Sequence, residues 1–82
     1  MSGAHAMMNA MLDALARETA RAAGAETALV SVTFDILAEG EAARHETAIV
    51  RATRTLVFSS GEALGADGKR LMAATAVHRI VR

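Results

Sequence analysis

The sequence has no cysteine, proline, tryptophan or tyrosine, and it contains only two phenylalanines. Without cysteine, disulfide bonds and thiolate zinc sites are excluded. With so few aromatic side chains, Ala, Val, Leu, Ile and Met must build the hydrophobic core, and such side chains bury little area per residue. A monomer of this composition should be marginally stable, so the composition favours a chain that self-associates.

An excess of charge of one sign is also lacking, since nine basic residues balance nine acidic ones. The sequence therefore carries no electrostatic signal for nucleic-acid binding. His5, His45 and His78 are far apart and lack metal-ligand spacing, so no metal site is expected. The sequence has no apolar run long enough for a membrane span and no signal-peptide pattern at its start. We therefore expect no membrane association, and the cytoplasm is the default localisation.

The length of 82 residues allows one small domain, 1–82, without a visible linker or repeat. In its first part, apolar or small side chains recur at spacings of three and four, which is typical of one face of a helix. They are Met8, Met11, Leu12, Leu15 and Thr19. Gly24 is a natural residue to follow the end of a helix. The sequence therefore predicts a helix over about residues 4–23.

After Gly24 the apolar residues alternate with period two, which is typical of strands. We expect three long strands over about 27–38, 44–64 and 70–82, with Gly61 marking a bulge or bend in the second. Asp67-Gly68 predicts a hairpin before the last strand, whose two faces are both largely apolar. The predicted fold is α+β, with one long helix packed on an antiparallel sheet that has two open edges.

Four segments carry a resemblance to a known family. They are Met11–Asp13 with its acidic residue, the turn Glu39–Glu41, the strand segment Arg51–Phe58 and the hairpin Asp67–Lys69. Over residues 10–82, their order and spacing resemble the acyl-CoA thioesterases of the hotdog superfamily, of the phenylacetate-pathway and thioesterase-superfamily type. The resemblance implies a hotdog-like fold, and we expect its sheet to continue across a dimer.

The sequence departs from that family at its start. The His-Gly-Gly motif of the family would fall on Ala4–Ala6, where neither glycine is present. In the family, backbone amides of this motif polarise the thioester carbonyl. The usual first strand also has no counterpart before the helix, so the resemblance implies a truncated or minimal member.

The resemblance implies a hydrolase that cleaves acyl-CoA thioesters at a site between the subunits of a homodimer or a dimer of dimers. Asp13 would act as general base or nucleophile. Ser31 would help to orient water across the interface, and His5 would replace the histidine of the motif. Arg54 and Lys69 would contact CoA phosphates. No cofactor is implied besides the CoA moiety of the substrate.

Each candidate also has a simpler structural interpretation. Asp13 is explained as well by a surface pairing with Asn9 or Arg17, one helical turn away on either side. Ser31 fits as a strand residue on a less apolar face, and His5 as a polar residue near a flexible terminus. The two candidate phosphate ligands fit as solvated charges. The five methionines fit as core filler or as the lining of an acyl pocket.

Two other functions compete with the enzyme. The first is a non-catalytic acyl-CoA-binding or structural oligomerisation module that has lost the His-Gly-Gly chemistry. The second lies outside the hotdog superfamily and is a small dimeric α+β protein with a structural role. A strand and a Gly-Gly pair ahead of Asp13 would favour the enzyme over the non-catalytic module.

Overall fold

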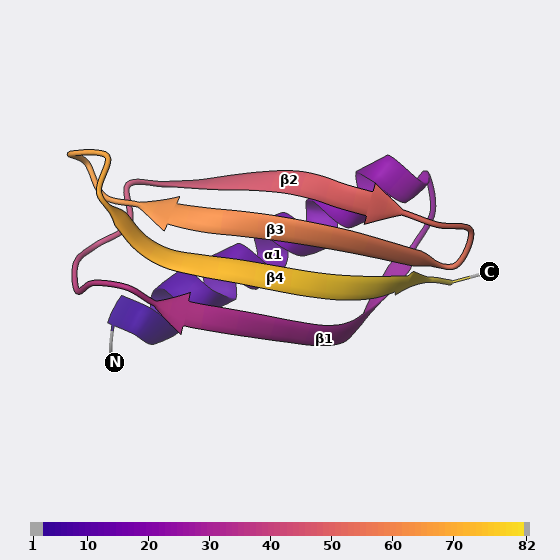
Figure 1. The fold of residues 1–82 in the computed structure, drawn as a ribbon, viewed down its shortest axis with the longest axis horizontal. Coiled ribbons are helices and arrows are strands. Elements are labelled where there is room, and N and C mark those ends of the chain that lie inside the picture. The colour runs from indigo at the N-terminus through magenta and orange to yellow at the C-terminus, as the bar shows by residue number, and fades with distance from the viewer. Residues whose placement is uncertain (1–2, 82) are drawn as a thin grey trace.

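The computed structural model describes residues 3–81 and has two layers, a helix and a four-stranded sheet (Figure 1). The elements are α1 (Gly3–Ala23), β1 (Thr27–Ile36), β2 (Arg44–Ala52), β3 (Leu56–Leu64) and β4 (Arg70–Ile80). The strand order is β1-β4-β3-β2, and every neighbouring pair is antiparallel. The helix runs along one face of the sheet, which confirms the predicted α+β, hotdog-like class.

The prediction of one long strand over residues 44–64 is wrong, because this segment folds back and forms β2 and β3. The chain reverses over Thr53–Thr55. The Thr53 backbone N–H donates to the Leu56 carbonyl at 2.8 Å, and the Thr53 hydroxyl oxygen accepts from the Leu56 N–H at 3.0 Å. A threonine hydroxyl is a weaker turn signal than Gly, Pro, Asn or Asp. The sheet therefore has four strands rather than the three predicted.

The helix agrees with the prediction at both ends. Its buried stripe has a strict spacing of four, which keeps one narrow face against the sheet. The stripe consists of Met7, Met11, Leu15 and Thr19. Gly24 has a φ of 63°, and its N–H donates to the Arg21 carbonyl at 3.3 Å. This left-handed residue ends the helix, because glycine adopts that backbone conformation without steric cost.

The core lies between the buried stripe of α1 and the inner faces of β3 and β4. On the sheet it contains mainly small side chains, with Ala63, Ala74 and Ala76 beside Met72. Gly61 is not a bulge, as the sequence suggested, because the ladder continues through it to Thr47 and Ala74. A Cβ on Gly61 would lie 2.4 Å from the Met11 sulfur. Glycine is therefore needed there for close helix–sheet contact.

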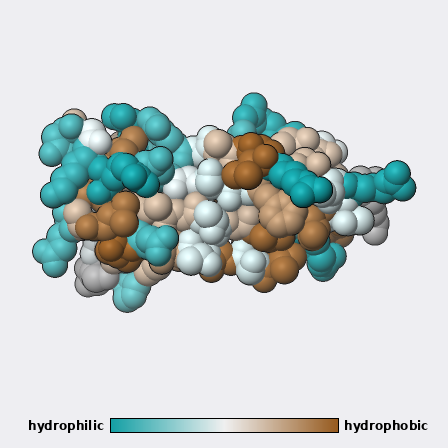
Figure 2. All heavy atoms as spheres, viewed as in Figure 1, coloured by the Kyte–Doolittle hydropathy of each residue, from teal (hydrophilic) through white to brown (hydrophobic). Residues whose placement is uncertain are grey.

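We call the sheet face that points away from α1 the outward face. Opposite partners in a ladder point to the same side, so the strand register assigns its members. Along β3 and β4 they are Leu56, Phe58, Ser60, Glu62, Ala73, Thr75, Val77 and Arg79. Figure 2 looks onto this face and shows pale, neutral side chains at its centre and hydrophilic ones toward both ends.

Two absences apply to the described residues 3–81. No helix there is long and apolar enough to cross a membrane. Within the same residues, no group of three or more His, Cys, Asp or Glu side chains lies close enough to hold a metal ion.

Candidate functional site

A cavity of about 440 Å³ lies beside the first turns of α1, and we call it the α1 groove. One wall is helical, and the other consists of the segment Gly40–Ala42 and His45 of β2. The helical wall contains Gly3, Ala6, Met7 and Ala10. Small side chains on the helix leave the space open, and the lining is mostly apolar. The groove can therefore accept an apolar chain of moderate length.

His45 is the polar side chain at the inner wall of the α1 groove. It points toward the helix layer, opposite Ala63 in the ladder, and its Nε2 atom is buried. Among the described residues, no hydrogen-bond partner for this Nε2 was found. Each imidazole nitrogen can take part in a hydrogen bond, so the buried Nε2 has an unused hydrogen-bonding capacity next to the groove. The sequence analysis gave His45 no role, although a polar residue at an inward strand position is a signal.

Asp13 is exposed on the side of α1 that faces away from the sheet. It follows Ala6 and Ala10 at spacings of four and three, so the three residues form one stripe along the helix. Ala6 and Ala10 line the α1 groove, and Asp13 therefore lies one turn beyond its end. This position allows a carboxylate to act on a group that projects from the groove.

The other two predicted catalytic residues do not join Asp13 within one chain. Ser31 is exposed on the outward face of β1, opposite Val77. The sheet and the helix thus lie between Ser31 and Asp13. His5 is exposed in the first turn of α1. A site that contains both Asp13 and Ser31 requires a second chain, and the roles of all three residues stay predictions.

The two predicted phosphate ligands lie at opposite ends of β3 (Figure 1). Arg54 is in the turn before this strand, and Lys69 is in the hairpin after it. At roughly 3.3 Å per residue, the nine-residue strand separates them by about 30 Å. They do not form a common phosphate site within one chain. The hairpin itself is confirmed, since Gly68 has a φ of 83° and the Lys69 N–H donates to Asp67 Oδ1 at 2.9 Å.

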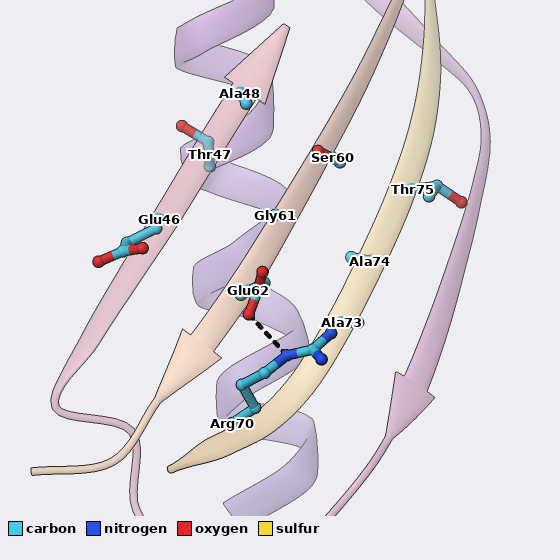
Figure 3. Close-up of a pocket in the computed structure, with 10 residues that line it drawn as sticks. All are labelled: Glu46, Thr47, Ala48, Ser60, Gly61, Glu62, Arg70, Ala73, Ala74 and Thr75. Carbon is cyan, nitrogen blue, oxygen red and sulfur yellow. Dashed lines mark ion pairs between the residues drawn. The ribbon is translucent and has the colours of Figure 1, made fainter. Parts of the chain in front are cut away.

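A shallow hollow of about 330 Å³ lies on the outward face over β2, β3 and β4 (Figure 3). Glu62 and Arg70 form an ion pair across it at 2.7 Å. Its other lining residues are mostly small, such as Ala73 and Thr75. None of the predicted catalytic residues lines this hollow, and its charged residues are already in ion pairs, Glu62 with Arg70 and Glu46 with Arg44 outside the hollow. The α1 groove is therefore the better candidate site.

Two further buried polar side chains lie on the inner face of the sheet. Ser59 on β3 and His78 on β4 are both nearly inaccessible, and Ser59 Oγ and His78 Nδ1 have no hydrogen-bond partner among the described residues. Burial lowers the pKa of His78 below its ordinary value, because the charged imidazolium loses its hydration there. His78 is therefore a neutral imidazole at pH 7.

Comparison with known proteins places the fold. No protein-family model matches the chain, and no curated protein matches it in sequence. The BH2602 protein from Bacillus halodurans, whose crystal structure contains CoA, superposes with a TM-score of 0.79 at 13% identity. That match covers 87% of this chain and 50% of the other. A protein from the thioesterase superfamily gives a TM-score of 0.70 at 15% identity, over 77% and 49% of the two chains.

The chain therefore shares the hotdog fold of these two proteins, which confirms the fold that the resemblance implied. The chain spans about half the length of each of these two solved proteins.

Proposed function

We propose that this protein hydrolyses acyl-CoA thioesters at a site that two subunits complete together. The observation that carries the proposal is the position of Asp13, a carboxylate one helical turn beyond the end of the apolar α1 groove that Ala6 and Ala10 line. The fold supports the same chemistry, because it is shared with a thioesterase-superfamily protein and with a protein crystallised with CoA.

The α1 groove would hold the acyl chain between its helical and loop walls, where apolar surface leaves water. The thioester carbonyl would project toward Asp13. As general base, Asp13 would take a proton from water while the water oxygen attacks the carbonyl carbon. The carbon–sulfur bond then breaks, and the proton passes to the CoA sulfur. As nucleophile, the carboxylate would attack the carbonyl carbon itself, and the carbon–sulfur bond would break to give an anhydride and CoA thiolate. Water would then hydrolyse the anhydride, and the proton it releases would protonate the thiolate.

The need for hydrogen-bond donors to the carbonyl oxygen implies a second subunit. The first backbone N–H groups of a helix have no acceptor within the helix, so the first turn of α1 offers such donors. Ala4 and Asp13 are about 14 Å apart along the helix axis, too far to act on one carbonyl. The N–H donors would therefore come from one subunit and Asp13 from the other. Ser31 would also come from the subunit that does not supply Asp13.

The sheet edges support such an assembly. β1 and β2 are both edge strands, and unpaired edges favour pairing with another chain. Each edge also exposes large apolar side chains, Leu29 and Val30 on β1 and Val50 on β2. A dimer in which the sheet continues across one of these edges would bury this surface.

Replacing Asp13 with Asn tests the assignment, because the side chain keeps its shape and loses its charge. General-base assistance is worth about 10²–10⁴-fold, so the rate of acyl-CoA hydrolysis should fall by at least about 100-fold. Ser31→Ala should cost less, since Ser31 would only orient water. Glu18→Gln is the matched control, because it removes one negative charge from the same helix and breaks only a surface pair with Arg21.

An Asp13→Asn variant that hydrolyses acyl-CoA as fast as the parent would reduce Asp13 to a surface neighbour of Arg17. In that case the catalytic part of the proposal fails.

A non-catalytic acyl-CoA-binding module is the second candidate. The observation that favours it is the segment Ala4–Ala6, which lies in α1 without the glycines of the His-Gly-Gly motif. This candidate predicts that the parent protein binds an acyl-CoA ester but does not cleave it.

A further inference from the structure

The outward face carries a second group of residues, at the end nearest the β2–β3 turn. Arg51 of β2 lies opposite Phe58 of β3, which in turn lies opposite Val77 of β4. One pair further along, Leu56 lies opposite Arg79. We call these five residues the arginine patch. Figure 2 shows hydrophobic and hydrophilic side chains side by side in this half of the face.

A β-bulge brings Arg51 into the patch. In β2, Ile49 lies opposite Ser59 and Arg51 opposite Phe58, which leaves Val50 without an opposite residue. In a regular ladder, Val50 would lie opposite Phe58 and Arg51 opposite the buried Val57, so Arg51 would point toward the helix layer. Bulges commonly redirect a side chain next to a functional site. Val50 itself is 67% exposed, so burying this valine in the core does not explain the bulge.

The cations of the patch differ from those at the other end of the same face. There, Arg44 is paired with Glu46 at 2.9 Å and Arg70 with Glu62 at 2.7 Å. Within residues 3–81, no ion pair involves Arg51 or Arg79. Both side chains are exposed. The patch therefore has two available guanidinium groups and no carboxylate that neutralises them.

The dimensions of the patch match a multiply phosphorylated ligand with an aromatic ring. Arg51 and Arg79 lie two strands apart and are offset by two residues along the strands, which separates their Cα atoms by about 12 Å. Two long, planar guanidinium groups at this separation can each bind a phosphate in a bidentate manner. Between them, the half-buried Phe58 and Val77 offer an apolar surface on which a flat ring can pack.

We propose that the arginine patch binds the phosphorylated adenosine end of CoA, with phosphates on Arg51 and Arg79 and the adenine ring over Phe58. The identity of this ligand rests on the function proposed above. Arg54 lies in the turn at the same end of the sheet, whereas Lys69 lies at the other end. The patch thus offers CoA phosphates two other cations than Arg54 and Lys69, the phosphate contacts that the resemblance implied.

The patch lies beside the β2–β3 turn and the α1 groove beside the first turns of α1, and these two parts of the backbone lie toward opposite ends of the chain (Figure 1). An antiparallel continuation of the sheet about a two-fold axis would bring the patch end of one subunit beside the groove end of the other. The patch and the groove would lie on opposite faces of such a sheet, so the pantetheine arm of one CoA ester would have to pass the ends of the strands to reach both.

Titration calorimetry with adenosine 3′,5′-bisphosphate tests the patch without any thioester. The parent should bind this nucleotide saturably, and Arg51→Gln and Arg79→Gln should each weaken binding by about tenfold. Phe58→Leu should weaken binding of the bisphosphate but not of inorganic pyrophosphate, which has no ring. Arg44→Gln is the control, because it removes the same charge from the other end of the same face.

The inference is overturned if the parent does not bind the nucleotide saturably, or if Arg44→Gln weakens binding as much as Arg51→Gln. Hydrolysis of an acyl-N-acetylcysteamine, which lacks the nucleotide, separates the two proposals. Arg51→Gln should leave that reaction unchanged, while Asp13→Asn should slow it. If the parent cleaves no thioester while nucleotide binding still depends on both arginines, the enzyme proposal fails and the patch stands.

Discussion

His78 is buried in the sheet where an apolar residue would be expected. It is 3% exposed, its ladder neighbours are Leu29 and Val57, and its Nδ1 has no hydrogen-bond partner among the described residues. Buried polar atoms in folded proteins almost always have a hydrogen-bond partner, so an unpartnered one either binds a water molecule or lowers the stability of the fold. At the residue scale, His78 is the group that most directly links pH to the stability of this fold.

Acidification should destabilise the protein through His78. Burial lowers the pKa of His78 in the folded state, and in the unfolded chain it returns to about 6.5. Between these two values the unfolded state binds more protons, so the free energy of unfolding decreases as the pH falls. Above pH 6.5 the stability that depends on neutral His78 is fully present. Urea unfolding of the parent and of His78→Leu at several pH values measures this contribution.

The leucine variant should lose part of the pH dependence between neutral and mildly acidic pH, because it removes the proton-binding group. Identical slopes of unfolding free energy against pH in the two proteins would contradict this account of His78.

The spatial arrangement of the candidate site residues could not have been read from the sequence. The candidates Asp13, Ser31 and His5 came from a family resemblance, and their positions in one chain neither join them nor assign their roles. His45 and Arg51 became candidates only because of what faces them, an apolar groove for His45 and, for Arg51, a phenylalanine one strand away from a second arginine. Such neighbours are set by strand register, which the local sequence does not reveal.

At the level of elements, the contact between α1 and β3 depends on Gly61. A Cβ at this position would lie 2.4 Å from the Met11 sulfur and 3.3 Å from the Glu46 carbonyl oxygen. Met11 is completely buried, so its side chain cannot swing into solvent. Adding side-chain volume at Gly61 would therefore push the helix away from the sheet.

Gly61→Val should destabilise the fold by about 1–3 kcal/mol, the usual cost of overpacking a core. Ser60→Val is the matched control, because it places the same side chain on the outward face one residue earlier and should change stability by less than about 0.5 kcal/mol. Chemical denaturation measures both values. A combined Gly61→Val, Met11→Ala variant should cost less than the two changes added together, and simple additivity would contradict a direct clash.

The elements that the sequence predicted well are those with strong local signals. The helix ends at Gly24 because glycine tolerates a positive φ, and the last hairpin forms at Asp67-Gly68 for a similar reason. The turn at Thr53–Thr55 was missed, because threonine hydroxyls stabilise it and apolar alternation continues on both sides. The bulges at Val30 and Val50 were missed too, since an extra apolar residue does not interrupt a strand pattern.

At the scale of the whole molecule, the chain should be at least a dimer. Val30 and Val50, on opposite edges of the sheet, are 55% and 67% exposed, and the core consists largely of alanine and methionine. Both features favour burial against another copy. Light scattering at micromolar concentration should give a mass of at least twice the 8.5 kDa of one chain. A stable mass of one chain would contradict a site shared by two subunits.

The most direct test of the central claim is the rate at which the protein releases free thiol from acyl-CoA esters of increasing chain length. The account predicts turnover above the uncatalysed rate for esters whose chains fit a groove of about 440 Å³, and its near loss in Asp13→Asn. Absence of turnover with every chain length, by a protein that is folded and dimeric, would contradict it.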